Sequence, residues 1–514
     1  MRPTFRHLLI SLITLFLLPA VNAQSVLPEN FDTFVTEGME QWEIPGIAFA
    51  VVKDGDIAFT GGFGVLKLGE SAPVDENSLF GIASVSKHIT ASSLAVLVDE
   101  GKIKWDDPVI KHIPWFRLSD PWATEHVTIH DLLTHQVGVG RVLGNRLQFM
   151  TNRSREELLY RLRYHDFEQP FRSSYVYSNV MYTLAGEIVE AVTGVSWDEF
   201  IKERFFEPLG MNRTHSSFTK MQDESNAAWP HQYIEGSVVP IPRRSWNVAA
   251  PAGGIHSTAA DMARWMILQL NQGKFQNTQY LSPASLHDIQ TPKIALPVSS
   301  VEADQRSYGY GFNITDYNGY RMLEHGGATD GMNTSYALFP ELNLGIIVMT
   351  NTFTTFREAI VRTIVDHVTG AAPTDWNSIF YNSYERQFEA ASDRRDRIHE
   401  ARNPHTTPAY DLQEYTGTYH HPMYDTAEIT LVDGDLYVTL FEDETLKGKL
   451  EHWQHDTFRI LWNNPAQREE FLKFGHGFEG GVQSATIRFT LRPQLLQVGA
   501  YPTNYFRDVT YEKR

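Results

Sequence analysis

The chain has 514 residues, of which 42% are hydrophobic and 21% are charged, the composition of a globular protein that is too long for one compact core. Its formal charge of −18 argues against nucleic acid and anionic membrane surfaces as partners, because both attract basic patches. It has no cysteine, which excludes disulfides, thiolate metal sites, a thiol nucleophile and a lipidated cysteine anchor.

The N-terminus has the pattern of a secretory signal peptide. Two arginines and a histidine precede an apolar run at residues 8–18, and small residues follow at positions 21–23. An uncleaved membrane anchor is the alternative, but a spanning helix needs ~20 apolar residues, and no later segment approaches that length. We therefore predict a signal peptide over residues 1–23 and an exported protein, periplasmic or extracellular, with no integral membrane span once the signal is removed.

Residues 24–375 predict one α+β domain. Apolar strands flank a turn within residues 46–65, and a second strand pair follows at 335–339 and 344–350. Helical patterns lie between these pairs, at residues 89–100, 155–164, 182–192 and 258–270. The simplest architecture is an antiparallel sheet built from early and late strands and flanked by helices, with a helical subdomain.

The composition changes after this domain. Residues 376–408 predict a charged helix and a linker, because acidic and basic side chains dominate until two prolines interrupt the pattern. Residues 409–514 contain seven or eight short strand patterns, which are typical of a small antiparallel barrel or sandwich. This terminal domain could gate an active site, bind an apolar ligand or form a homo-oligomer.

A serine and a lysine three residues apart mark the start of one predicted helix. This spacing places Ser84 and Lys87 on the same helical face, where the amine can take the hydroxyl proton. Backbone N–H groups at a helix start can also stabilise an oxyanion. The same spacing arises by chance in a chain of this length, as Ser217 and Lys220 illustrate, so an ordinary N-cap is the alternative interpretation of Ser84.

Two further motifs favour catalysis. Tyr177-Ser178-Asn179 is the single tyrosine-x-asparagine of the chain, and a tyrosine near a lysine can carry a proton while an asparagine amide holds a substrate amide. His325-Gly326-Gly327 is the single histidine-x-glycine, and glycines there allow a substrate to approach the backbone. The N–H of Ala328 can supply an oxyanion donor. Taken alone, the tyrosine motif is more often a loop turn, and the alternative for the histidine motif is a glycine-rich turn with a surface histidine.

In order and spacing, these motifs resemble S-x-x-K, Y-x-N and K-T-G or H-x-G, the motifs of class C β-lactamases and penicillin-binding-protein-like serine hydrolases. The resemblance covers about residues 30–370. Supporting similarity extends over residues 104–108, 128–138, 208–211 and 253–258. Residues 415–419 and 450–453 are similar to the lipocalin-like domain that some of these peptidases carry. The resemblance therefore implies a β-lactamase/transpeptidase-like fold followed by a lipocalin-like β-barrel.

The resemblance also implies three catalytic residues. Ser84 would be the nucleophile and Lys87 its general base. Tyr177 would pass a proton to the leaving group and later activate the deacylating water.

The residues that the resemblance implies for substrate binding surround these three. Asn179 would hold the amide on the acyl side, and His325 would steer the protonation of Tyr177 or bind substrate. Gly327 would lie beside the substrate, and the N–H groups of Ser84 and Ala328 would form the oxyanion hole.

Together these features predict an exported serine hydrolase that acts through an acyl-serine on small amides, namely short peptides or D-amino-acid derivatives. The alternatives are an esterase or weak β-lactamase with the same residues, or a penicillin- or peptidoglycan-binding protein without turnover. The third motif has His325 in place of lysine and Gly326 where a hydroxyl is usual, so groups that help bind a β-lactam carboxylate are missing. We predict no cofactor and no metal, because the histidines at 420, 421, 452 and 455 lack a metal-ligand spacing.

Overall fold

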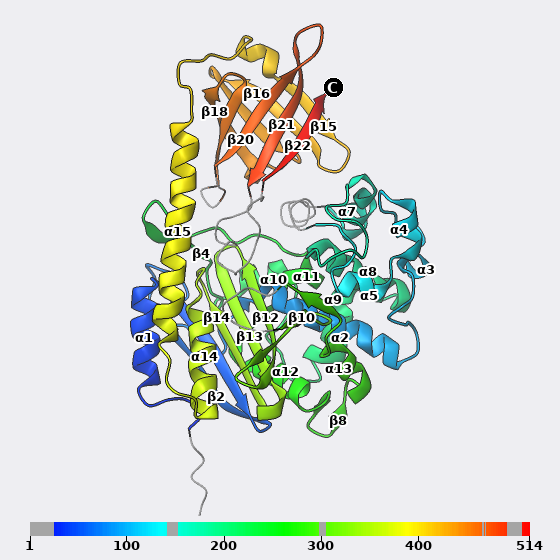
Figure 1. Cartoon of the computed structure of the whole chain (residues 1–514), viewed down its shortest axis with the longest axis vertical. Helices are drawn as coiled ribbons and strands as arrows, with labels where there is room; N and C mark the ends of the chain where they lie inside the picture. Colours follow the sequence, from blue (N-terminus) through cyan, green and yellow to red (C-terminus); the bar gives the residue numbers. More distant parts are fainter. Residues whose placement is uncertain (1–24, 141–152, 298–304, 465–466, 468, 491–505) are drawn as a thin grey trace, which may run out of the picture.

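The computed structural model describes residues 25–140, 153–297, 305–464, 467, 469–490 and 506–514. A barrel lies above an α+β body, and one long helix, α15 (Trp376–Glu400), runs along the side of the body toward the barrel (Figure 1). Within the described residues, no helix combines the length and the apolar character needed to cross a membrane. The predicted signal peptide lies outside those residues.

Eight antiparallel strands form the central sheet in the order β2-β1-β14-β13-β12-β11-β10-β9. Its middle joins segments from opposite ends of the body, because β1 pairs with β14, where Ala50 lies opposite Ile347. The predicted sheet of early and late strands is therefore confirmed. The strands are β1 (Gly46–Lys53), β2 (Asp56–Gly64), β9 (Ile294–Leu296), β10 (Arg306–Tyr308), β11 (Asn313–Tyr317), β12 (Tyr320–Thr329), β13 (Met332–Phe339) and β14 (Leu344–Thr350).

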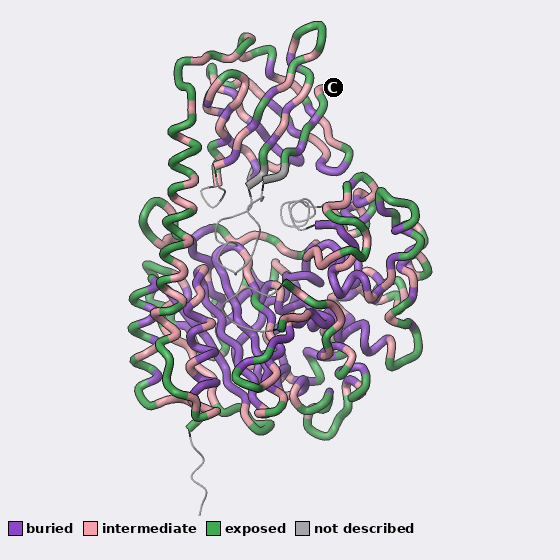
Figure 2. Tube along the Cα trace, in the orientation of Figure 1, coloured by how far each residue is buried: buried purple, intermediate pink, exposed green. Residues whose placement is uncertain are grey.

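The central strands are buried because helices cover both faces of the sheet. Every residue of β13 and β14 is buried, as the purple centre of Figure 2 shows. Along β1, Ile47 and Phe49 pack with α1 (Phe31–Gln41) and α14 (Phe356–Thr369), whereas Ala48 packs with the core on the opposite face. Burial on both faces explains why β1 and β14 are nearly continuous apolar runs without alternation, whereas β13 also carries the buried polar residues Asn333, Thr334 and Ser335.

Helices, single helical turns and short strand pairs fill the region on the other face of the sheet. The α-helices are α2 (Ser86–Asp99), α3 (Val109–His112), α4 (Pro121–His126), α5 (Ile129–Leu133), α7 (Arg155–Arg161), α8 (Asn179–Thr193), α9 (Trp197–Ile201), α10 (Phe218–Asp223), α11 (Ala250–Gly253), α12 (Ala259–Leu270) and α13 (Pro283–Ile289). The helical turns of the body are η1 (Ala83–Val85), η2 (Leu162–Tyr164), the π-helical η3 (Lys202–Phe206) and η4 (Pro340–Leu342). The short strand pairs are β3 (Phe80–Gly81) with β6 (His256–Ser257), β4 (His231–Ile234) with β5 (Ser237–Pro240), and β7 (Lys274–Phe275) with β8 (Thr278–Gln279).

The half of the sheet from β9 to β12 was not foreseen. The motif His325-Gly326-Gly327 lies inside β12, so the alternative interpretation of a glycine-rich loop turn is wrong. Two glycines lower the strand propensity of this stretch, and β9 and β10 are too short to show a period in the sequence. The third motif is therefore held on a strand.

Asp107 fixes the turn before α3. Its carboxylate accepts hydrogen bonds from the Lys104 N–H at 3.0 Å and Lys111 Nζ at 2.7 Å, and its Oδ2 lies 3.0 Å from His112 Nε2. Burial alone would raise the pKa of Asp107, but these hydrogen bonds and the charge of Lys111 outweigh it and lower the pKa to about 2.

We expect Asp107→Asn to lower the free energy of unfolding by about 2 kcal/mol at neutral pH, since a depressed carboxyl pKa stabilises the fold wherever the unfolded carboxyl is ionised. This contribution is present above the ordinary pKa of 3.8 and is lost as the pH falls through about 2. Urea unfolding of both proteins should therefore show a gap at pH 7 that narrows below pH 4. A gap independent of pH would contradict the ionic origin.

Helix α15 is anchored to the body by its first turns. Trp376 Nε1 donates to the buried Asp366 carboxylate at 2.7 Å, and the ring of Tyr381 meets that of Trp42 edge-on, with 5.0 Å between centroids. These aromatic residues precede the charged stretch, so the helix begins within the body and continues past it toward the barrel.

The C-terminal strands close into an eight-stranded antiparallel barrel. Two helical turns accompany it, η5 (Leu412–Tyr415) and η6 (Glu444–Leu446). Inward side chains such as Tyr419, Phe458 and Tyr511 are buried, so aromatic rings fill its interior. The strands are β15 (Gly417–His421), β16 (Asp425–Val432), β17 (Asp435–Leu440), β18 (Lys447–Gln454), β19 (Thr457–Trp462), β20 (Glu470–His476), β21 (Val482–Thr490) and β22 (Phe506–Lys513).

The barrel touches the body through the turn between β15 and β16. Asp425 accepts hydrogen bonds from Arg153 and from Arg161, the latter at 3.3 Å. Arg161 also donates to the Pro422 carbonyl at 3.2 Å. Because both arginines flank or belong to α7, the barrel is tied to the helical subdomain as well as to α15.

Candidate active site

Ser84 lies in a strained turn between a strand and a helix. The chain leaves β3, passes through η1 and enters α2, and Ala83 takes a left-handed conformation with φ 49°. Non-glycine residues rarely adopt this conformation, and such strain concentrates at functional sites. Ser84 is also the single residue between positions 81 and 90 that is not buried, so the turn presents its hydroxyl outward.

Lys87 is fully buried behind Ser84 and makes three short contacts. Its Nζ lies 3.1 Å from Ser84 Oγ, 2.6 Å from Asn179 Oδ1 and 2.7 Å from the Ala252 carbonyl oxygen. The last two atoms can only accept hydrogen bonds, so each engages a hydrogen of the amine. In the neutral form of Lys87 the lone pair would turn toward the Ser84 hydroxyl, the arrangement that a general base requires.

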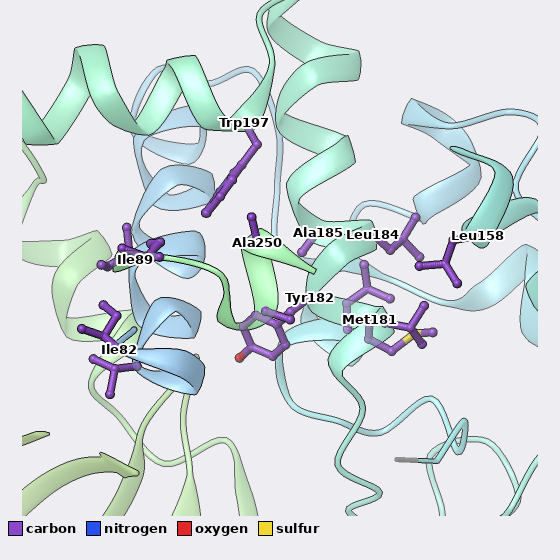
Figure 3. Packing of buried hydrophobic residues seen from close by; sticks show 14 of the residues in the cluster. Ile82, Ile89, Leu158, Met181, Tyr182, Leu184, Ala185, Trp197 and Ala250 are labelled. Carbon is purple, nitrogen blue, oxygen red and sulfur yellow. The ribbon is translucent and has the colours of Figure 1, made fainter. Parts of the chain in front are cut away.

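At the start of α8, Tyr177 reaches Ser84 and Asn179 reaches Lys87. The Tyr177 hydroxyl lies 2.9 Å from Ser84 Oγ, and Lys87 Nζ lies 4.8 Å from the centre of the Tyr177 ring. Helices α2 and α8 are held together by buried side chains, among which Figure 3 shows Tyr182 and Ala250 between the two helices. The structure thus brings Ser84, Lys87, Tyr177 and Asn179 into direct contact.

The remaining predicted residues lie on β12, beside η1. His325 is buried, with Nδ1 2.7 Å from the Gly326 carbonyl and Nε2 3.2 Å from the Tyr308 hydroxyl. Its ring centroid lies 6.5 Å from that of Tyr177. Because a carbonyl only accepts, Nδ1 carries a proton and Nε2 faces the tyrosine hydroxyl. Whether His325 steers the protonation of Tyr177 stays a prediction.

Gly327 allows β12 to approach the Ser84 turn. A Cβ atom placed on it would lie 2.2 Å from the Ile82 carbonyl oxygen and 3.1 Å from the Ala83 Cβ. No real side chain tolerates such a contact, so this glycine makes room for the protein backbone. Ala328, the next residue, therefore lies next to the turn that carries Ser84.

The family model described as Beta-lactamase matches residues 31–371. The chain belongs to the β-lactamase family. A second model, described as a domain of unknown function, matches residues 401–498, which cover most of the barrel.

Similar proteins of this family include fungal hydrolases. Unguisins hydrolase ungD' of Aspergillus campestris is 29% identical over 77% of this chain and 77% of its own length. Unguisins hydrolase ungD of Aspergillus violaceofuscus is 27% identical over 81% of this chain and 79% of its own. Protein flp of Staphylococcus aureus is 24% identical over 70% of each chain.

A solved structure has a similar fold over most of this chain. The octameric penicillin-binding protein homologue from Pyrococcus abyssi aligns with a TM-score of 0.60 over 89% of this chain and 97% of that chain, at 22% identity. At this identity the likeness concerns the fold. It confirms the predicted β-lactamase/transpeptidase-like domain with a C-terminal barrel.

Sequence reasoning missed the histidine that supports the Tyr177 segment of this β-lactamase-family site. Nδ1 of His135 accepts the Ser178 N–H at 3.0 Å, and its carbonyl accepts the Val176 N–H at 2.8 Å. The ring of His135 packs on that of Tyr177 with 4.4 Å between centroids. His135 lies in the segment 128–138, where resemblance to the family was the available signal.

Two other contacts of the site were also not predicted from the sequence. The hydroxyl of Tyr308, on β10, contacts His325 Nε2. The backbone carbonyl of Ala252, in α11, accepts a hydrogen bond from the Lys87 amine. A carbonyl has no residue signature, and β10 was not predicted. The described residues contain no group of three or more histidine, aspartate or glutamate side chains placed to bind a metal ion.

Proposed function

We propose that this protein is an exported serine hydrolase that acts through an acyl-Ser84 intermediate on small amides, namely short peptides or D-amino-acid derivatives. The observation that carries the proposal is the Lys87 amine, which is held by Asn179 and Ala252 with its third position on Ser84 Oγ. Two fungal relatives whose names describe them as hydrolases support hydrolysis. Export rests on the signal-peptide pattern at the N-terminus.

Acylation begins when the Ser84 oxygen attacks the substrate carbonyl carbon and its proton passes to neutral Lys87. The negative charge that develops on the carbonyl oxygen is stabilised by the N–H groups of Ser84 and Ala328. The tetrahedral intermediate then expels the amine, which takes the proton of the Tyr177 hydroxyl. An acyl-Ser84, a Lys87 ammonium and a Tyr177 phenolate remain.

Deacylation reverses both proton movements. The Tyr177 phenolate takes a proton from water, and the resulting hydroxide attacks the acyl carbon. Ser84 leaves with the proton that Lys87 held, so lysine, tyrosine and serine all return to their starting forms. One water is consumed, and the products are an acid and an amine.

Intact-protein mass spectrometry tests the nucleophile. Wild-type protein incubated with a fluorophosphonate should gain one adduct, and Ser84→Ala should gain none. Ser217→Ala is the matched control, because Ser217 belongs to the same Ser-x-x-Lys spacing but caps α10, where its oxygen accepts the Lys220 N–H. Failure of the folded wild type to form an adduct would refute the hydrolase and favour a binding protein.

The barrel supports a further part of the proposal, a homo-oligomer built through the C-terminal domain. The solved structure that shares this architecture is described as octameric. Light scattering on the full chain should report an oligomer. Arg161→Ala, which removes a contact between the barrel and the body of the same chain, should report one as well. A monomeric wild type would contradict the proposed oligomer and would leave the proposed hydrolase mechanism unaffected.

A further inference from the structure

Strand β12 has an open edge where it passes the Ser84 turn. Its pairing with β11 ends at Glu324, opposite Asn313, whereas its pairing with β13 continues to Thr329. Among the described residues, β12 therefore has a paired strand on one side only from residue 325 onward. The η1 turn packs against this stretch, because a Cβ on Gly327 would lie 2.2 Å from the Ile82 carbonyl oxygen.

Asn333 holds the opposite side of that stretch. It lies on β13 directly across from Ala328, is fully buried, and donates from Nδ2 to the Gly327 carbonyl at 2.9 Å. Its Oδ1 accepts the Thr354 N–H at 3.0 Å and Arg357 Nη1 at 2.9 Å. Two donors at one end and an acceptor at the other leave one orientation for the amide.

Arg357 holds the Asn333 amide in this orientation. Its side chain is buried, and it also donates to the Thr354 carbonyl and pairs with Glu358 at 2.6 Å. A hydrogen bond from a charged donor is stronger than one between neutral groups. Asn333 is thus clamped between the start of α14 and the peptide that joins Gly327 to Ala328.

That peptide links Asn333 to catalysis. The Gly327 carbonyl and the Ala328 N–H belong to one planar trans peptide and point in opposite directions. A carbonyl held on the β13 side directs the Ala328 N–H to the open edge of β12, on the stretch against which the Ser84 turn packs. We propose that Asn333, supported by Arg357, is a positioning residue that aims the Ala328 N–H at the oxyanion of the reaction, an inference that rests on the proposed hydrolase function.

Asn333→Asp removes the donor to Gly327 and keeps an acceptor for Arg357 and Thr354. The second-order rate constant for phosphonylation of Ser84 by a fluorophosphonate should fall by roughly 10- to 100-fold. This is less than the effect of removing one oxyanion donor, because the Ala328 N–H is misaligned but still present. Affinity for benzeneboronic acid, whose serine adduct places an oxygen at the same position, should fall in parallel. Asn333→Ala should lower the rate and the affinity in the same way. In Asn333→Ala the pH dependence of phosphonylation should also keep its midpoint, because this variant adds no charge and leaves Lys87 and Tyr177 untouched.

Asn351→Asp is the matched control, since Asn351 is equally buried and donates from Nδ2 to the Val65 and Leu66 carbonyls, both at 3.1 Å, away from Ala328. It should match wild type in rate and in boronic acid affinity. Folded Asn333 variants that also match wild type would overturn the inference, as would a shifted pH midpoint in the uncharged Asn333→Ala variant. Failure of the proposed function would appear instead in the wild type, as the absence of any Ser84 adduct.

Discussion

Lys87→Met should lower the hydrolysis rate by about 1,000-fold or more, because it removes the base that takes the Ser84 proton. Methionine fills the same buried space without an amine, so packing between α2 and α8 should survive. The loss should appear in kcat and kcat/KM together, since the proton transfer belongs to the transition state. The measurement is turnover of an amide and of an ester that share one acyl group.

Lys220→Met is the control for this substitution. Lys220 stands three residues after Ser217, the same spacing as in the predicted site, but it belongs to the short helix α10, where Ser217 is an N-cap. Its replacement should leave turnover within twofold of wild type. Retention of more than a tenth of the activity by Lys87→Met would mean that another group accepts the Ser84 proton, and Lys87 would then be structural.

The contacts that a sequence could predict are those set by helical geometry. Ser84 and Lys87 are three residues apart at the entry of α2, and this spacing alone brings their side chains to one face. Asn179 opens α8, and its contact with Lys87 required the motifs to be joined by family resemblance, because 92 residues separate the two. The predicted domain limits stay predictions.

The supporting contacts are long-range and lack a pattern. His135 and Ser178 are 43 residues apart, and the bond between them depends on a left-handed backbone at His135, with φ 60°, that no periodicity signals. Asn333 looked like any polar residue of a strand end, although it lies fully buried between β12 and α14. Such residues are fixed by tertiary packing, so local propensity gives no indication of them.

Removal of the Tyr177 hydroxyl should also cause a large loss of activity. Tyr177→Phe should lower amide hydrolysis by about 100-fold or more, because the amine leaves as a strong base unless a proton reaches it. The phenyl ring can keep its packing on His135 and its place near Lys87, so the loss isolates the hydroxyl that contacts Ser84 Oγ at 2.9 Å.

An ester with a good leaving group separates the two roles of Tyr177. A p-nitrophenyl ester needs no proton to leave, so Tyr177→Phe should still be acylated by it at a rate near that of wild type. Deacylation requires a Tyr177 phenolate to activate water, and in wild type this forms when the phenol gives its proton to the departed nitrophenolate or to solvent. Tyr177→Phe has no such group, so the acyl-Ser84 form should accumulate and appear by mass as a lasting adduct. Tyr175→Phe, in the same segment, should turn the ester over without accumulation. If Tyr177→Phe loses the same activity on the amide and on the ester, and no adduct accumulates, Tyr177 positions the substrate. Another acid would then protonate the leaving group.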